Sequence, residues 1–179
     1  MDLDKALAIK ALKKLDDLLV KESRGPMTLV IGGGGAMILA HGFAGKTKDI
    51  DAVAKGRSDL VEIDAETKAV AQQLKIEPDW LNPYFSTFIH YLPKDYGDRL
   101  LKIYDGMSLH AIGLGAEDLL IMKFMADRDK DLKHIRHLIK RGARLEVVEE
   151  RLLELEKQKV AKAKEALARF YEICEEMGL

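Results

Sequence analysis

The sequence predicts an α+β protein, in which a small mixed β-sheet is flanked by helices and followed by a helical C-terminal region. Residues 2–22 repeat leucine and alanine at helical spacing, with lysines and aspartates between them. Residues 29–53 hold two short strand patterns, separated by a glycine-rich turn and a short helix. Residues 145–177 are dense in Glu, Lys, Ala and Leu, which favours one long helix or two.

A chain of 179 residues suits one domain with an appendage. We expect an N-terminal helix over residues 1–26, a central domain over 27–141 and a C-terminal helical extension over 142–179. The 29 basic and 30 acidic residues nearly cancel. This balance argues against extensive nonspecific binding of nucleic acid, although it allows a local basic patch.

The single cysteine, Cys174, excludes an internal disulfide and a cysteine-based zinc site. It is also typical of a reducing cytoplasm. No apolar run approaches 18 residues, and the amphipathic N-terminus lacks the pattern of a signal peptide. We therefore expect a cytoplasmic protein without a membrane-spanning segment.

Four glycines, Gly32 to Gly35, follow the apolar strand pattern Leu29-Val30-Ile31 and open a short helix. Glycine lets the backbone turn sharply and lets a ligand approach its amides. The N–H groups at a helix start, together with the helix dipole, attract anions. We therefore expect a phosphate-binding turn, with Gly32, Gly33 and Gly34 as its contacts.

Two aspartates, Asp49 and Asp51, lie in the next strand pattern. Strand alternation puts both carboxylates on one face and Ile50 and Ala52 on the other. Such carboxylates repel each other unless a cation lies between them, and a pair of divalent metal ions is the usual occupant in phosphoryl-transfer sites. A polar turn between surface elements is the alternative. The glycine turn followed by the aspartate pair favours a nucleotidyl-transfer site.

Two better-known glycine motifs do not fit. The dinucleotide-binding fingerprint needs a small third residue, but Met37 or Ile38 occupies that position. Residues 40–47, AHGFAGKT, resemble a Walker A loop without its first glycine, yet they follow a helix and open a strand, which inverts the required context. Lys46 and Thr47 remain candidate phosphate contacts.

The middle of the chain predicts smaller elements. Residues 55–59 suit a loop, and residues 64–75 suit a helix with Asp64 as its N-cap. Trp80 suits a core position. Residues 84–92 are aromatic and irregular, with room for only a short strand.

Residues 99–104 and 107–112 are two strand patterns separated by Asp105-Gly106, which predicts a hairpin. Turn geometry alone accounts for Asp before Gly. Asp105 is otherwise the candidate for a third metal-binding carboxylate.

Lys123 lies in the apolar run LLIMKFMA, where an unpaired ammonium is costly. It either extends to the surface along its apolar stem or faces a cavity that holds phosphates. One helix through residues 115–141 would align four polar side chains, with Asp131 beside them, whereas a break near residue 129 would scatter them. The four are Lys123, Asp127, Lys130 and His134.

The order Gly-Gly, short helix, His-Gly and Thr-x-Asp-Ile-Asp resembles the minimal nucleotidyltransferases of the DNA polymerase β type. Within them, the chain is most similar to the bacterial AbiEii/AbiGii toxin-like group. The resemblance implies that Gly33 and Gly34 hold a nucleoside triphosphate. It also implies that Asp49 and Asp51 bind Mg²⁺ or Mn²⁺. Many members have Gly-Ser in this loop, whereas this chain has only glycine there.

The resemblance covers residues 27–141. Trp80 and Asn82 resemble a Trp-Leu-Asn signature of the group. A further pattern of lysine, alanine, arginine and a Lys-Asp pair is matched by Lys123, Ala126, Arg128, Lys130 and Asp131, while His134 replaces a further Asp. It implies that Lys123 neutralises phosphate charge during transfer. It also implies that Asp131 completes the acidic cluster or orients Lys123, and that Arg128 is a nucleotide contact.

We therefore expect a metal-dependent enzyme that transfers NMP from an NTP to a hydroxyl of RNA, including tRNA, or of protein. Such an enzyme could be the toxin of a toxin–antitoxin or phage-defence system. An antitoxin or a second copy of the chain would then bind the C-terminal helix. The alternative is a catalytically inactive nucleotide-binding or protein-interaction module with the same fold. A structural protein that assembles through its C-terminal helix is the third reading.

Overall fold

The computed structural model describes residues 1–56 and 59–179. Its internal contacts divide the chain into two compact units. Unit 1 comprises residues 1–87 and 99–114, and unit 2 comprises residues 88–98 and 115–179. The expected division into residues 1–26, 27–141 and 142–179 stays a prediction.

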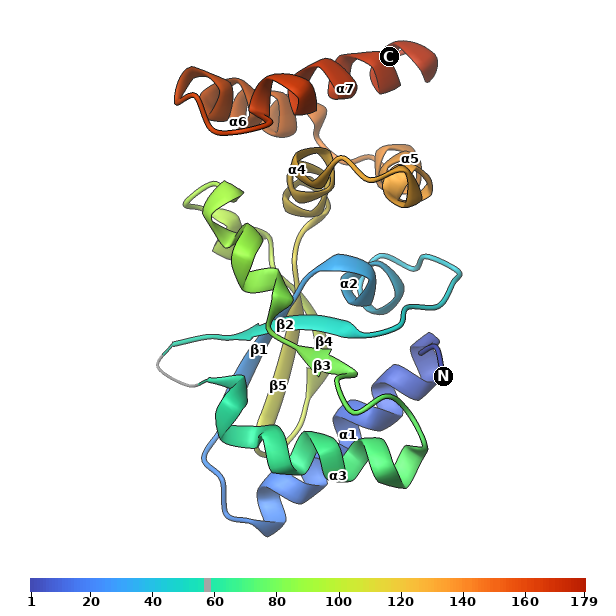
Figure 1. Ribbon diagram of the computed structural model, residues 1–179, viewed down its shortest axis with the longest axis vertical. Helices are drawn as coiled ribbons and strands as arrows, with labels where there is room; N and C mark the ends of the chain where they lie inside the picture. The colour runs from blue at the N-terminus through green and yellow to red at the C-terminus, as the bar shows by residue number, and fades with distance from the viewer. Residues whose placement is uncertain (57–58) are drawn as a thin grey trace. The chain divides into compact units, whose positions relative to one another are not determined.

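Unit 1 contains a mixed sheet with the strand order β3-β2-β1-β5-β4 over the described residues (Figure 1). β1 pairs in parallel with β5 and antiparallel with β2, whereas β2–β3 is parallel and β4–β5 antiparallel. This confirms the predicted small mixed sheet. The strands are β1 Met27–Ile31, β2 Ile50–Ala54, β3 Leu81–Asn82, β4 Leu101–Asp105 and β5 Leu109–Gly113.

The helices of unit 1 are α1 Lys5–Lys21, α2 Gly33–Leu39 and α3 Asp64–Leu74, as far as the described residues go. α1 packs against α3 and β5, and α2 packs against β2. Asp4 caps α1, because its carboxylate accepts the N–H of Leu7 at 2.9 Å. Trp80 is fully buried, and its indole N–H donates to the Thr67 carbonyl at 3.0 Å, which confirms it as a core residue.

Two details of this region differ from the sequence prediction. Asp64 is not the N-cap of α3, because a 3₁₀ helix at Leu60–Ile63 leads directly into it and Asp59 caps that earlier turn. Tyr84–Tyr91 forms a 3₁₀ helix rather than a short strand. The loop expected at residues 55–59 includes residues 57 and 58, which lie outside the described residues.

The predicted hairpin is present as β4 and β5, but Asp105 belongs to β4 and the turn starts at Gly106. Asp16 of α1 holds this turn. Its buried carboxylate accepts the backbone N–H groups of Met107, Ser108 and Leu109 at 3.1, 2.8 and 2.8 Å. The Tyr104 hydroxyl donates to the same carboxylate at 3.0 Å.

Unit 2 is helical in its larger segment, with helices α4 Ala116–Ala126, α5 Leu132–Lys140, α6 Leu145–Lys157 and α7 Ala163–Glu176. α4 packs against α5, α6 and α7, and α6 packs against α7. Phe124 of α4 meets Phe170 of α7 edge to face, with ring centroids 5.5 Å apart. Cys174 is buried on α7. Residues 145–177 therefore form two helices, one of the two alternatives that the sequence allowed.

Of the two alternatives for residues 115–141, the structure has the broken helix and not the continuous one. α4 ends where Asp127 adopts a left-handed backbone conformation, with φ 45°. A 3₁₀ turn at Asp129–Asp131 then leads into α5. None of the helices in the described part of the chain has the length and apolarity needed to cross a membrane.

Candidate functional site

The glycine-rich turn joins β1 to α2 in unit 1. Gly32 is the N-cap residue, and its N–H donates to the Asp51 carbonyl at 2.9 Å. Gly33 has a φ of +54°, a backbone conformation that suits glycine. No side chain caps α2, so the N–H groups of its first turn have neither an intrahelical carbonyl nor a capping oxygen as partner.

Neighbouring side chains lie too close to this turn for a Cβ atom at these glycines. A Cβ at Gly33 would come within 2.5 Å of Asp51 Oδ2, and one at Gly34 within 2.6 Å of Thr47 Oγ1. A Cβ at Gly32 would lie 3.0 Å from the ring of Phe85. The structure therefore brings the glycine turn, Thr47 and Asp51 together, and their role as a nucleotide site stays a prediction.

Asp51 lies in β2, and Asp49 lies directly before it. Ile50 and Ala52 are fully buried, whereas Asp51 and Asp49, the residue before the strand, are half-buried. Asp51 lies opposite Asn82 of β3 in the strand register. The Thr47 hydroxyl donates to the Asp49 carbonyl at 3.0 Å, which fixes the segment leading into β2. Lys46 is exposed on that segment.

These donors fit a magnesium ion. Mg²⁺ prefers oxygen ligands, usually one or two carboxylates completed by water and substrate phosphates. Because Gly33 has no Cβ, the Asp51 carboxylate can lie directly against the backbone of the turn. Among the described residues there is no group of three or more His, Cys, Asp or Glu side chains that could hold a metal ion.

Asp105 does not join the aspartate pair in the sheet. Its strand, β4, is separated from β2 by β1 and β5. Its carboxylate instead accepts from Lys102 and lies 2.6 Å from His110 Nδ1. The hydrogen bond from Lys102, assisted by His110, lowers the pKa of Asp105. Asp105 therefore belongs to an exposed ion-pair cluster on the hairpin.

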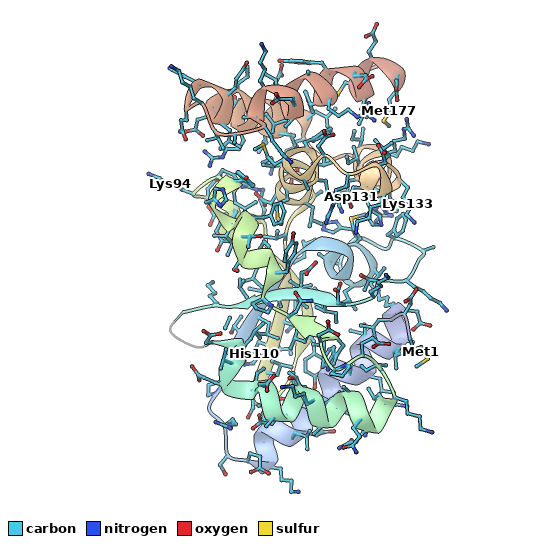
Figure 2. The ribbon with its side chains drawn as sticks, in the orientation of Figure 1. Met1, Lys94, His110, Asp131, Lys133 and Met177 are labelled. Atoms are coloured by element: carbon cyan, nitrogen blue, oxygen red, sulfur yellow. The ribbon has the colours of Figure 1, made fainter. Side chains whose placement is uncertain are left out.

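The second cluster surrounds Lys123 in unit 2. Lys123 is 3% exposed, and its ammonium donates to Asp131 Oδ1 at 2.6 Å. Arg128 Nε donates to the other oxygen of Asp131 at 2.8 Å. Asp131 lies between α4 and α5 (Figure 2). Lys123 therefore does not extend to the surface, because a buried carboxylate binds its ammonium.

The pKa values of this cluster are shifted. Burial lowers the pKa of Lys123 more than the adjacent Asp131 raises it. Burial alone would raise the pKa of Asp131. Hydrogen bonds from His134 and Lys123, with the charges of Lys123 and Arg128, outweigh burial and lower it. Asp131 is thus held as a carboxylate by its cationic neighbours.

His134 completes the cluster. Its Nδ1 lies 3.1 Å from Lys123 Nζ and 3.3 Å from Asp131 Oδ1. Burial, assisted by the charge of Lys123, lowers the pKa of His134, although Asp131 opposes this effect. Nδ1 can donate to Asp131 when it carries the proton, or accept from Lys123 when the proton is on Nε2, but it cannot do both at once.

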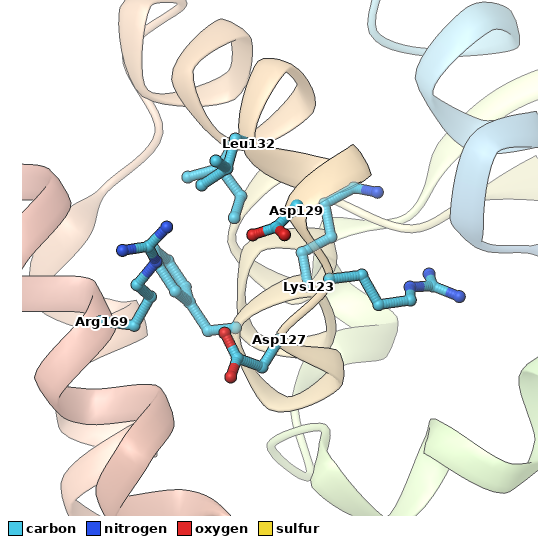
Figure 3. A pocket seen from close by; sticks show the side chains of 8 residues that line it. Lys123, Asp127, Asp129, Leu132 and Arg169 are labelled. Atoms are coloured by element: carbon cyan, nitrogen blue, oxygen red, sulfur yellow. The ribbon is translucent and has the colours of Figure 1, made fainter.

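A small pocket opens beside this cluster. Arg169 reaches it from α7, while Asp127 and Asp129 line it from the segment after α4 (Figure 3). Its cavity volume is about 10 Å³. This is below the range of roughly 300–1,000 Å³ that is usual for ligand pockets. Lys123 lines a space too small to enclose a nucleotide.

The predicted site residues thus form two groups. Gly32, Gly33, Gly34, Lys46, Thr47, Asp49 and Asp51 belong to unit 1, whereas Lys123, Arg128 and Asp131 belong to unit 2. A joint site that contains both groups stays a prediction. The ring of Phe85 packs on Gly32. This contact was not predictable from the sequence, because the aromatic segment around Phe85 has no regular pattern.

Comparison with known proteins gives one match. Residues 9–175 match the model of a protein family described as "Nucleotidyltransferase of unknown function (DUF6036)". No curated protein and no solved structure matches the chain.

Proposed function

The chain belongs to this family of nucleotidyltransferases, and from that premise we propose metal-dependent transfer of NMP from an NTP to a hydroxyl group. The observation that carries the proposal is the position of Asp51 against Gly33. A glycine turn with uncapped helix amides and the Asp51 carboxylate meet at one point of unit 1. Phosphates and their counterions need both of these features.

Each residue has a distinct part in the proposed reaction. The N–H groups of the turn and the Thr47 hydroxyl would bind triphosphate oxygens. Asp49 and Asp51 would hold magnesium or manganese. The metal, when bound, would neutralise phosphate charge and orient the triphosphate.

Lys123 would neutralise charge on the transferred phosphoryl group. Asp131 would act as a positioning residue, because its carboxylate already fixes the ammonium. Lys46 and Arg128 are exposed and would be secondary contacts to the nucleotide.

We also propose the finer assignments that the resemblance to the AbiEii/AbiGii toxin-like group implies. These are an RNA or protein acceptor, a toxin role in the cytoplasm, and binding of an antitoxin or a second copy through the C-terminal helices.

A catalytically inactive nucleotide-binding or protein-interaction module is the second candidate. Close packing by Asp51, Thr47 and Phe85 accounts for three of the glycines without a ligand. Asp131 likewise occupies Lys123 without a phosphate. Such a protein would bind an NTP without turnover, or would not bind one.

The test is thermal melting with each of the four NTPs, with and without magnesium, followed by transfer of labelled NMP. Binding to the native state alone raises the melting temperature by mass action. We expect a magnesium-dependent rise that Asp49→Ala/Asp51→Ala abolishes. Asp2→Ala/Asp79→Ala is the matched control, because it removes two exposed carboxylates from unit 1.

Gly33→Ala tests the turn itself. The new Cβ would collide with Asp51. Gly42 has a similar φ, +62°, but a Cβ added there would meet no atom within 4 Å, so Gly42→Ala is the matched control. We expect Gly33→Ala to lose the NTP response and Gly42→Ala to keep it. A response that survives both Gly33→Ala and the loss of the aspartates would refute this site. Binding without any transfer would favour the inactive module.

A further inference from the structure

The distribution of charge along the chain is uneven. Residues 128–144 carry seven lysines and arginines against two aspartates, a net charge of +5. The rest of the chain therefore carries −6, since the whole chain has a net charge of −1. Such an uneven distribution indicates a locally basic surface, even though the net charge of the whole chain is close to zero.

α5 collects this charge on one side. Its apolar residues Ile135, Leu138 and Ile139 are buried, and it carries no acidic residue. The opposite side and the adjoining turns form what we call the basic face. Helical geometry places its four members on α5 within an arc of about 100°. Lys130 lies in the 3₁₀ turn before α5, and Arg141 follows the last residue of α5. The basic face comprises Lys130, Lys133, Arg136, His137, Lys140 and Arg141.

Much of this charge is available to a partner. Lys130, Lys140 and Arg141 are exposed and form no ion pair with any residue that the structure describes. Arg136 pairs with Glu176 at 2.7 Å, but both side chains are nearly half exposed, so this pair contributes little to stability.

The residues around the basic face indicate which class of partner binds it: an acidic protein, a membrane surface or a nucleic acid. Protein interfaces are anchored by apolar and aromatic side chains. None of the large exposed hydrophobic residues recorded for the described chain lies within residues 128–144. A helix that binds a membrane surface must expose its apolar side, whereas that side of α5 is buried. A polar, strongly basic surface without an apolar anchor is typical of nucleic-acid binding.

We propose that the basic face of α5 binds the phosphodiester backbone of RNA. The inference rests on the proposed function in one respect, because RNA is one of its two candidate acceptors. The contacts are to phosphates, which fix affinity and position but read no sequence.

The test measures binding of the full-length chain to a fluorescein-labelled single-stranded RNA of about 20 nucleotides, at salt concentrations from about 50 to 200 mM. The variant Lys130→Gln/Lys140→Gln/Arg141→Gln should bind about tenfold more weakly at low salt. The slope of log affinity against log salt should fall in magnitude by about two, since each lost phosphate contact removes about 0.7 for a single strand. The measurement is fluorescence anisotropy.

The matched control is Lys10→Gln/Lys13→Gln/Lys21→Gln, which removes three exposed lysines from α1. It should bind like the native chain. Lys130→Arg/Lys140→Arg/Arg141→Lys keeps the charge and should retain binding, which separates loss of charge from loss of folding. Equal weakening by both glutamine variants would attribute binding to net charge and overturn the proposal.

Two further outcomes would also overturn it. One is no binding of RNA at low salt. The other is binding of polyglutamate or of phosphatidylserine vesicles at least as tightly as RNA, which would indicate an acidic protein or a membrane instead. Asp49→Ala/Asp51→Ala should bind RNA normally. A failed nucleotide site would appear in the NTP melting experiment and a failed basic face in the RNA anisotropy experiment, so the two failures can be distinguished.

Discussion

Lys123 and Asp131 are both buried, and each would be costly to bury alone. Their direct contact at 2.6 Å, with Arg128 on the second carboxylate oxygen, offsets that cost. From the sequence, Lys123 could be recognised as anomalous because it interrupts an apolar run. Its partner could not be derived from residue spacing, because that depends on where the helix ends. Helical spacing placed Asp131 beside Lys123 only if one helix ran through both residues, and the resemblance indicated it separately.

Asp131→Asn is expected to destabilise the protein by about 3 kcal/mol, because it leaves the ammonium of Lys123 buried without a counter-charge. Urea denaturation followed by circular dichroism measures this loss. Lys123→Met/Asp131→Asn should recover most of it, since the buried charge is then absent. Asp129→Asn, at an exposed neighbour, should be nearly silent. A double variant as unstable as Asp131→Asn would show that the ion pair is not the cause.

The break between α4 and α5 decides the arrangement of the second cluster. The sequence suggested a break near residue 129 only as an alternative, because no glycine or proline stands there. The chain instead turns at Asp127, a residue type that tolerates the left-handed conformation. α4 is buried on nearly all sides, so its amphipathic period is weak and does not reveal its end. By contrast, the glycine turn and β2 have strong local patterns and were predicted correctly.

The attachment of the β4–β5 hairpin to α1 was not predictable from the sequence. Asp16 looks like one of many polar residues on an amphipathic helix, yet it is 5% exposed and accepts hydrogen bonds from three backbone amides. Gly106 permits this approach, since a Cβ there would lie 2.1 Å from Asp16 Oδ2. The interaction joins residues about 90 positions apart, which no local pattern reports.

Asp16→Ala should destabilise unit 1 by about 2–4 kcal/mol, because several donors of the hairpin turn lose their acceptor while partly buried. The measurement is urea denaturation followed by Trp80 fluorescence. Asp17→Ala, which removes an exposed carboxylate from the same helix, is the control and should have little effect. A loss no larger than that of the control would mean that solvent replaces these hydrogen bonds.

At the scale of the whole molecule, each unit holds one buried aspartate with a lowered pKa. Burial raises the pKa of Asp16, but hydrogen bonds from Ser108, Met107, Tyr104 and Leu109 outweigh it. The pKa of Asp131 is lowered by its hydrogen bonds and cationic neighbours, again against burial. Both groups therefore bind protons less readily in the folded state than in the unfolded state.

We expect both units to lose stability in acid. A group whose folded pKa lies below its unfolded value of 3.8 stabilises the fold above that value, and this contribution disappears as the pH falls through the folded pKa. Urea midpoints measured between about pH 6 and pH 2 should therefore decline below about pH 4. Asp16→Asn should flatten the decline for unit 1. An unchanged pH dependence in that variant would contradict the assignment.

The burial of Trp80 and of Cys174 has a practical consequence for experiments on this chain. There is one tryptophan and one cysteine in the sequence, and the first lies in unit 1 and the second in unit 2. Burial, assisted by the charge of Glu149, raises the pKa of the Cys174 thiol, so it should react with thiol reagents mainly after its surroundings open. The native chain thus carries one fluorescent and one chemical reporter, each confined to a single unit. Ligands can be assigned to either half of the protein without introducing a label.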